Sequence, residues 1–106
     1  MQYVVTAMDH TDSEALFRRM AHREAHLAGL RKMIAEGSFL SGGAILDAEN
    51  RMIGSPAHVE FSTRVELDAW LKSDPYTEGK VWDRIEVREI RLLPVNQFKR
   101  SDTKST

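Results

Sequence analysis

The segment Tyr3-Val4-Val5-Thr6-Ala7-Met8 decides the fold, because it predicts a strand that is apolar on both of its faces. The run is short and rich in β-branched and apolar residues, as strands are. Successive side chains of a strand point to opposite faces of a sheet. Both faces of a sheet built on this segment therefore need cover from something less polar than water.

A long helix is predicted next, starting at a cap residue, Asp12 or Ser13, and running to about Glu36. Gly37 can adopt the left-handed conformation that ends a helix. Apolar side chains recur at three- and four-residue spacing, which predicts a single stripe facing the sheet. The members of this stripe are Leu16, Met20, Leu27, Leu30 and Ile34.

The rest of the chain predicts a hairpin, a second helix and a last strand. Gly42 and Gly43 weaken the first hairpin strand, and Pro56 is expected to mark the start of its partner. Thr63 and Glu66 have capping-box spacing at the start of the second helix. The expected elements are strands at residues 39–46, 57–61 and 81–93, and a helix from about residue 63 to 73.

This order, β-α-β-β-α-β, predicts a ferredoxin-like α+β sandwich with two helices on one face of an antiparallel sheet. The face of the sheet without helices is then either exposed to solvent or packed against another copy. The apolar first strand favours packing, and so a homodimer. Residues 1–95 are expected to form one domain. Residues 96–106 are expected to be a polar C-terminal tail.

Composition excludes several classes of function. The chain has 106 residues and a net charge of -1, so we predict binding neither to nucleic acid nor to an acidic membrane surface. No apolar stretch approaches the ~20 residues that span a bilayer. The chain begins without the charged and apolar run of a signal peptide, so a cytoplasmic protein is expected. With no cysteine, disulfides and thiol chemistry are excluded.

On a helical wheel, Arg23 falls near the middle of the predicted stripe and His26 on its shoulder. One interpretation is a polar pocket where the helix meets the sheet. The other is a buried structural salt bridge with a satisfied histidine beside it, since structural networks resemble sites at this level. The sequence leaves both open.

Two further patterns in the sequence contain residues that could carry chemistry. His22 and His26 have a spacing that suits a metal, but no cysteine or third ligand supports a site, so no metal is predicted. Asp74 either ends the second helix together with Pro75 or orients a histidine across the fold. The glycine pair 42–43 implies close approach by a ligand or by a neighbouring element.

Three segments together resemble one family. Residues 23–30, Arg-Glu-Ala-His-Leu-Ala-Gly-Leu, look like the Arg-x-x-His-Leu-x-x-Leu signature of the YCII-related (YciI-like) proteins. Residues 37–43, Gly-Ser-Phe-Leu-Ser-Gly-Gly, are similar to their Gly-x-Leu-x-x-Gly-Pro segment. Asp74-Pro75-Tyr76, Gly79 and the closing segment 85–88 resemble the family's ending. The likeness covers about residues 2–93, and the sequence departs at Gly43, where the family usually has proline.

This resemblance implies a dimeric α+β barrel in which two sheets pack face to face. It implies His26 and Asp74 as a catalytic acid/base pair, and Arg23, Gly43 and Tyr76 as substrate-binding residues. One branch of the family resembles a dehydrochlorinase of a chlorinated hydroxyquinol, and related muconolactone isomerases share the barrel. The expected function is therefore elimination or isomerisation of a small cyclic anion, without a cofactor.

Two other functions remain open at this point. The first is a non-catalytic domain that binds or presents a small molecule in the same pocket. The second is a structural dimer with no ligand.

Overall fold

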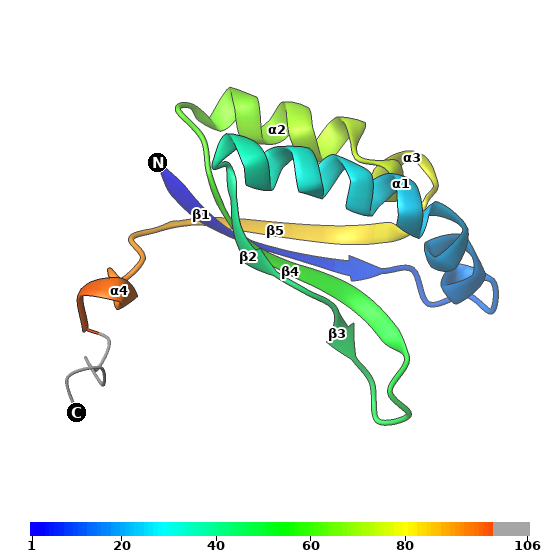
Figure 1. The fold of residues 1–106 in the computed structure, drawn as a ribbon. Coiled ribbons are helices and arrows are strands. Elements are labelled where there is room, and N and C mark those ends of the chain that lie inside the picture. Colours follow the sequence, from blue (N-terminus) through cyan, green and yellow to red (C-terminus); the bar gives the residue numbers. More distant parts are fainter. Residues whose placement is uncertain (99–106) are drawn as a thin grey trace.

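The computed structural model describes residues 1–98 and shows one twisted antiparallel sheet with the three helices α1, α2 and α3 on one of its faces (Figure 1). The strand order is β2-β4-β1-β5, with β3 paired to β4. This is the predicted ferredoxin-like α+β arrangement. The strands are β1 (Gln2–Asp9), β2 (Phe39–Gly42), β3 (Ile45–Leu46), β4 (Met52–Glu60) and β5 (Trp82–Ile90). The helices are α1 (Ala15–Glu36), α2 (Arg64–Ser73), α3 (Pro75–Glu78) and α4 (Val95–Phe98).

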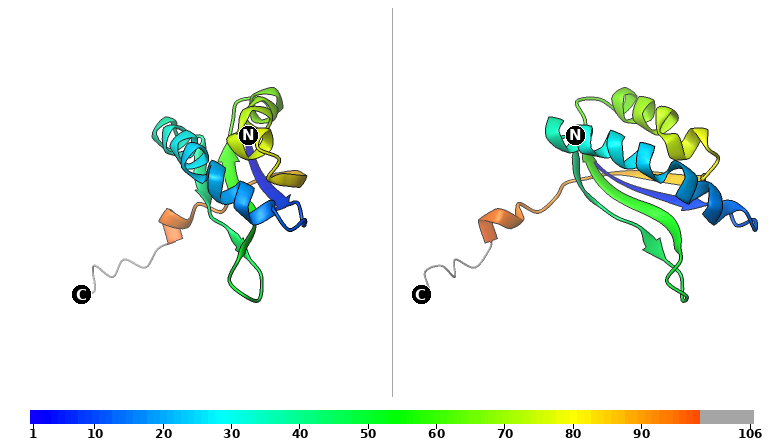
Figure 2. Two further views of the ribbon diagram at one scale, coloured as in Figure 1. Left: turned by 90° about the vertical axis from the view of Figure 1, so that its right-hand side faces the viewer. Right: turned by 45° about the vertical axis from the view of Figure 1, so that its right-hand side comes forward.

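Strand β1 lies at the centre and pairs with both β4 and β5. Its alternate residues Tyr3, Val5 and Ala7 are buried beneath the helices, which Figure 2 shows on one side of the sheet. They form the core together with residues of the neighbouring elements, chiefly Val59, Leu67, Tyr76 and Val81. Burial of this face supplies most of the driving force for folding, because apolar area is removed from water there.

The opposite face of the sheet, called here the free sheet face, is only partly apolar. Its β1 side chains, Val4, Thr6 and Met8, are half-buried. The β5 residues paired with them are charged and exposed: Arg88, Glu86 and Arg84, respectively. The two-sided character predicted for the first strand is therefore confirmed for β1 itself, while β5 adds alternating charges beside it.

Helix α1 is rotated relative to the prediction. Its buried residues are Ala15, Arg19 and His26, whereas much of the predicted apolar stripe is exposed. By the helical wheel, the buried face lies about 80° from the stripe. The prediction that Arg23 is central and His26 lies on the shoulder is therefore wrong. The physical reason is that Arg19 and His26 find buried carboxylate partners, so a polar face can be buried.

The hairpin also differs from the prediction in two places. The expected strand 39–46 is interrupted after Gly42, and its two parts, β2 and β3, both pair with β4. Pro56 lies inside β4 and does not begin it. The carbonyl oxygen of Pro56 accepts from the Gly43 amide at the interruption. Because the amide and carbonyl of a strand residue face the same edge, the missing N–H of proline falls where no ladder bond is needed.

The helix ends follow the predicted signals, except at the start of α1. Gly37 has φ 86 and closes α1, and Thr63 and Glu66 form the capping box of α2. The residue capping α1 is Glu14, which makes no side-chain cap bond, so the prediction of Asp12 or Ser13 is wrong. Within the expected tail, residues 95–98 form the single turn α4, and residues 99–106 lie outside the described part. Within residues 1–98, no helix is both long and apolar enough to cross a membrane.

The glycine pair yields a prediction with a built-in control. A Cβ at Gly42 would lie 2.5 Å from the Phe39 ring and 2.8 Å from the Pro56 carbonyl oxygen, whereas one at Gly43 would meet nothing within 4 Å. We expect Gly42→Ala to lower the free energy of unfolding by about 1–3 kcal/mol, as overpacking does. Gly43→Ala is expected to change it by less than about 0.5 kcal/mol. Urea unfolding checks this, and equal effects of the two substitutions would contradict it.

Candidate functional site

A buried histidine–carboxylate pair lies between α1 and the loop joining α2 to α3. His26 Nδ1 is 2.8 Å from Asp74 Oδ1 and 3.1 Å from Oδ2, and both residues are buried. An ionised carboxylate only accepts hydrogen bonds, so Nδ1 carries the proton and donates it. In the neutral ring, Nε2 is then left with a lone pair, which is the arrangement of a histidine able to act as a base.

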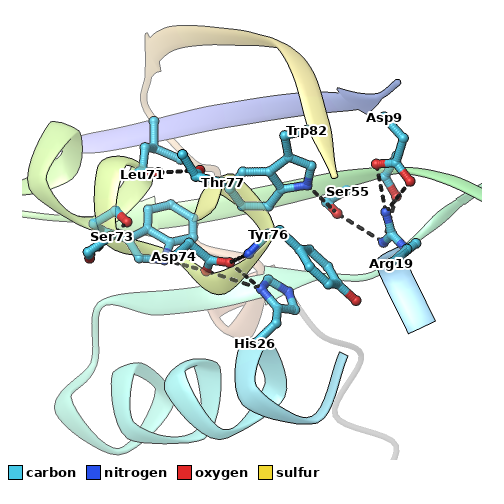
Figure 3. A network of polar contacts seen from close by, with 12 residues as sticks. Asp9, Arg19, His26, Ser55, Leu71, Ser73, Asp74, Tyr76, Thr77 and Trp82 are labelled. Atoms are coloured by element: carbon cyan, nitrogen blue, oxygen red, sulfur yellow. Dashed lines mark hydrogen bonds and ion pairs between the residues drawn. The ribbon is translucent and has the colours of Figure 1, made fainter. Parts of the chain in front are cut away.

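The chain holds the Asp74 carboxylate in place from three directions. Asp74 ends α2 and caps α3, where its Oδ1 accepts from the backbone N–H of Tyr76 at 2.9 Å. Its Oδ2 accepts from the indole Nε1–H of Trp70 at 3.2 Å. With His26, three donors from three helices converge on one carboxylate. Figure 3 shows Asp74 between His26 and the backbone of Tyr76.

Aromatic rings fix the orientation of the imidazole. The Tyr76 ring stacks on His26 with ring centres 3.9 Å apart and planes at 13°. Trp82 meets His26 edge-on, and its Nε1–H donates to Ser55 Oγ at 3.1 Å. Burial raises the pKa of Tyr76, with the Arg19 and Arg23 charges acting against it. The Tyr76 hydroxyl therefore stays protonated at neutral pH and can donate a hydrogen bond.

A second buried pair, Arg19 with Asp9, lies beyond Tyr76 (Figure 3). Arg19 Nη1 is 2.9 Å from both Asp9 carboxylate oxygens, and its Nη2 donates to Gly54 O and Ser55 Oγ. The guanidinium carbon lies 4.8 Å from the centre of the Tyr76 ring. Burial raises the pKa of Asp9, while the hydrogen bond and charge of Arg19 oppose this rise. Tyr76 therefore lies between two buried ion pairs.

His26 opens onto a cavity between α1 and the edge formed by β2 and β3. This cavity measures about 220 Å³, and Arg19, Arg23, His26, Gly43 and Tyr76 are among the residues that line it. A narrow inner cavity of about 20 Å³ also touches His26 and Gly43 and ends at Trp70 and Trp82. Asp74 lines neither cavity and lies behind His26. Nε2 is thus the ring nitrogen left for a molecule in the cavity.

Arg23 gives the cavity its positive charge. The side chain is half-buried and forms no ion pair with any of residues 1–98. The other lining guanidinium, Arg19, is neutralised by Asp9. A small anion in the cavity therefore meets one uncompensated cation beside the His26 imidazole.

The other histidine of the predicted metal spacing points elsewhere. His22 Nδ1 lies 2.8 Å from the Arg18 carbonyl oxygen, and its ring covers Gly79 so closely that a Cβ there would lie 2.5 Å away. In the part of the chain that the structure describes, no three histidine or carboxylate side chains converge as metal ligands would. The ring of His22 helps to pack α1 against α3.

The structure brings all five predicted site residues together: Arg23, His26, Gly43, Asp74 and Tyr76. It adds a second group that sequence reasoning missed, namely Asp9, Arg19, Ser55, Trp70 and Trp82. A signal for part of this group was present. Asp9 continues the buried alternation of β1, and Arg19 lies about two helical turns before His26 on the same face. A carboxylate on the buried face of a strand and a guanidinium on the buried face of the helix that covers it suggest a buried ion pair.

Comparison with known proteins gives relatives of matching length. The chain is 31% identical over 99 residues to protein YciI of Escherichia coli, an overlap covering 88% of this chain and 99% of the relative. It is 32% identical over 99 residues to an uncharacterized protein of Haemophilus influenzae, with the same coverage.

A solved structure shares the fold at lower identity. It is a 5-chloro-2-hydroxyhydroquinone dehydrochlorinase from Burkholderia phenoliruptrix in complex with 2,5-dihydroxybenzoquinone. The TM-score is 0.77 at 24% identity, covering 86% of this chain and 94% of the other. The profile of the YCII-related domain family matches residues 1–91. The chain therefore belongs to the YCII-related domain family.

Proposed function

We propose that the protein is a cofactor-independent enzyme that transfers protons on a small cyclic anion, with His26 as the acid/base. One observation carries the proposal: His26 is held by a buried carboxylate through Nδ1 and borders a cationic cavity through the rest of its ring. A histidine oriented in this way takes a proton at Nε2, and Asp74 stabilises the imidazolium that results.

Elimination and isomerisation both require that the site move a proton from one atom of the substrate ring to another. In a chlorinated hydroxyquinol, His26 would take a hydroxyl proton and return it to the ring carbon that bears chlorine. Loss of a second hydroxyl proton then expels chloride with the C–Cl electron pair. The balance is substrate minus HCl, without an external oxidant. Isomerisation of a lactone needs the first half only, a proton moved between two atoms of one ring.

The other lining residues supply binding and charge. Arg23 would pair with the substrate anion or the enolate formed when a proton leaves. The Tyr76 hydroxyl, which burial keeps protonated, would donate to a substrate oxygen. Gly43 adds no side chain to the cavity lining, so it leaves room for a planar ring.

A second candidate is a binding domain without turnover. The favouring observation is that His26 is only 7% exposed, stacked on Tyr76 and saturated at Nδ1, as a structural histidine would be. The same cavity and the same cation would then hold a ligand without changing it. A measurement of substrate turnover distinguishes this binding domain from the proposed enzyme.

We also propose that two copies pair through the free sheet face. Val4, Thr6 and Met8 lie there half-buried, and among residues 1–98 no helix covers this face. The β5 charges alternate in sign as Arg84, Glu86 and Arg88. An antiparallel second copy displaced by two residues from the register that places Glu86 opposite Glu86 would therefore place Arg84 of one strand opposite Glu86 of the other.

The catalytic proposal predicts a loss of turnover without a loss of fold. We expect His26→Gln and Asp74→Asn to lower the rate of chloride release from chlorinated hydroxyquinols about 10²–10⁴-fold, the usual contribution of acid/base groups. His22→Gln is the matched control, because its ring lies outside the cavity. Thermal unfolding verifies that each variant is folded. Unchanged turnover in folded His26→Gln would exclude His26 as the acid/base.

The charge assignment predicts a selective loss of affinity. The probe is 2,5-dihydroxybenzoquinone, an acidic quinone that is anionic at neutral pH. We expect Arg23→Gln to weaken its binding by calorimetry about tenfold, which equals about 1.4 kcal/mol. Arg31→Gln on the exposed side of α1 should leave affinity within about twofold. Similar losses in both variants would point to a diffuse charge effect instead.

A further inference from the structure

One side of α1 is apolar, and the rest of residues 1–98 leaves it largely exposed. We call it the outer flank and define it as Leu16, Met20, Leu27 and Ile34. Met20 is 51% and Ile34 56% exposed. The flank runs beside the mouth of the cavity, since Leu27 lines the cavity together with Arg23. A surface row of this kind on a monomer marks a site of contact.

The C-terminal segment 93–98 has the complementary property. Strand β5 ends at Ile90, and the Leu92 amide two residues later still donates to the side-chain Oε1 of Gln2 at 2.8 Å. Beyond it Leu93, Val95 and Phe98 are exposed by 67%, 61% and 67%. The backbone hydrogen bonds of this segment within residues 1–98 are local ones, from Val95 to Leu93 and from Gln97 to Pro94. Its apolar side chains therefore have no core of their own.

These two surfaces lie on opposite sides of one protomer. Figures 1 and 2 show α4 projecting away from the sheet on the side opposite α1 and α2. The longest extent of the molecule is 52 Å and the radius of gyration is 15.7 Å. A compact chain of this length has a radius of gyration of about 13 Å. The larger value reflects two projecting parts, the hairpin of β3 and β4 and the segment that ends in α4 (Figure 1). The segment that ends in α4 points to the side where a second copy would meet the free sheet face.

We propose that segment 93–98 of one protomer packs on the outer flank of α1 in a second copy of the chain and covers the mouth of its cavity. A two-fold dimer repeats such an exchange symmetrically, so each copy donates one segment and receives one. Leu93, Val95 and Phe98 would fill the apolar row next to Arg23 and Gly43. The site is then complete only in the dimer.

This inference concerns the shape of the cavity and not the chemistry of His26. A covering segment excludes water from a bound molecule whether or not that molecule reacts. It strengthens the attraction between Arg23 and an anion, because the local dielectric falls. Failure of the catalytic assignment would therefore leave the exchange intact, and failure of the exchange would leave the His26–Asp74 pair intact.

Cysteine cross-linking tests the exchange cleanly, because the natural chain has no cysteine. Two differently tagged chains are co-expressed, one with Phe98→Cys and the other with Met20→Cys or Ile34→Cys. Mild oxidation is expected to join the two chains, and mass spectrometry should find a disulfide between segment 93–98 and α1. The matched control is Phe17→Cys, exposed on the same helix but off the outer flank. It should cross-link at least tenfold less.

Two outcomes would overturn the proposal. One is cross-linking of both flank variants no better than the Phe17→Cys control. The other is a disulfide within a single chain of the double variant Phe98→Cys/Met20→Cys, which would mean that the segment folds back on its own helix.

A second measurement avoids introduced cysteines. The full chain with Leu93→Ser, Val95→Ser and Phe98→Ser keeps every residue of the cavity. We expect its dimer dissociation constant, measured by sedimentation, to rise at least tenfold, and its affinity for 2,5-dihydroxybenzoquinone to fall in parallel. A variant that dimerises and binds like the natural chain would show that nothing depends on the segment.

Discussion

The Asp74 carboxylate is the point on which α1, α2 and α3 depend together. It accepts from the His26 ring on α1, from the Trp70 indole on α2 and from the backbone at the start of α3. A buried carboxylate without partners would cost several kcal/mol, about the scale of a whole domain's margin of stability. The helices must therefore bring their donors to it. The same requirement that orders the helices leaves the His26 ring in one orientation.

A second buried pair makes the placement of α1 unambiguous. Arg19 meets Asp9 at the end of β1, about two turns from the contact of His26 with Asp74. Two polar anchors on one helical face set both the rotation and the axial position of α1. Apolar side chains alone would specify the rotation less strictly, because cores tolerate repacking as long as volume is kept. Tyr76 joins the anchors by stacking on His26 and facing the Arg19 guanidinium.

The sequence predicted well what local chemistry decides. The order of strands and helices, the turn at Gly37 and the capping box at Thr63 each follow from a few neighbouring residues. The rotation of α1 was predicted wrongly, because apolar periodicity assumes that apolar residues are the ones buried. Arg19 and Asp9 violate that assumption together, because each is buried with the other as its charged partner. His26 and Asp74 are 48 residues apart, so only the family resemblance suggested that they meet.

The rotation of α1 also connects the site to the surface of the molecule. Turning Arg19 and His26 inward by about 80° moves the apolar row outward by the same angle. The helix thus has one polar face buried in the protomer and one apolar flank outside it, the reverse of an ordinary amphipathic helix. Exposing such an apolar flank to water costs free energy, and contact with an apolar segment recovers it by removing the surface from water. Residues 93–98 form an apolar segment of this kind. They lie on the side of the free sheet face, opposite the face that α1 covers. The rotation that buries the imidazole is therefore also the one that exposes this apolar row, which the proposed exchange between two copies would cover.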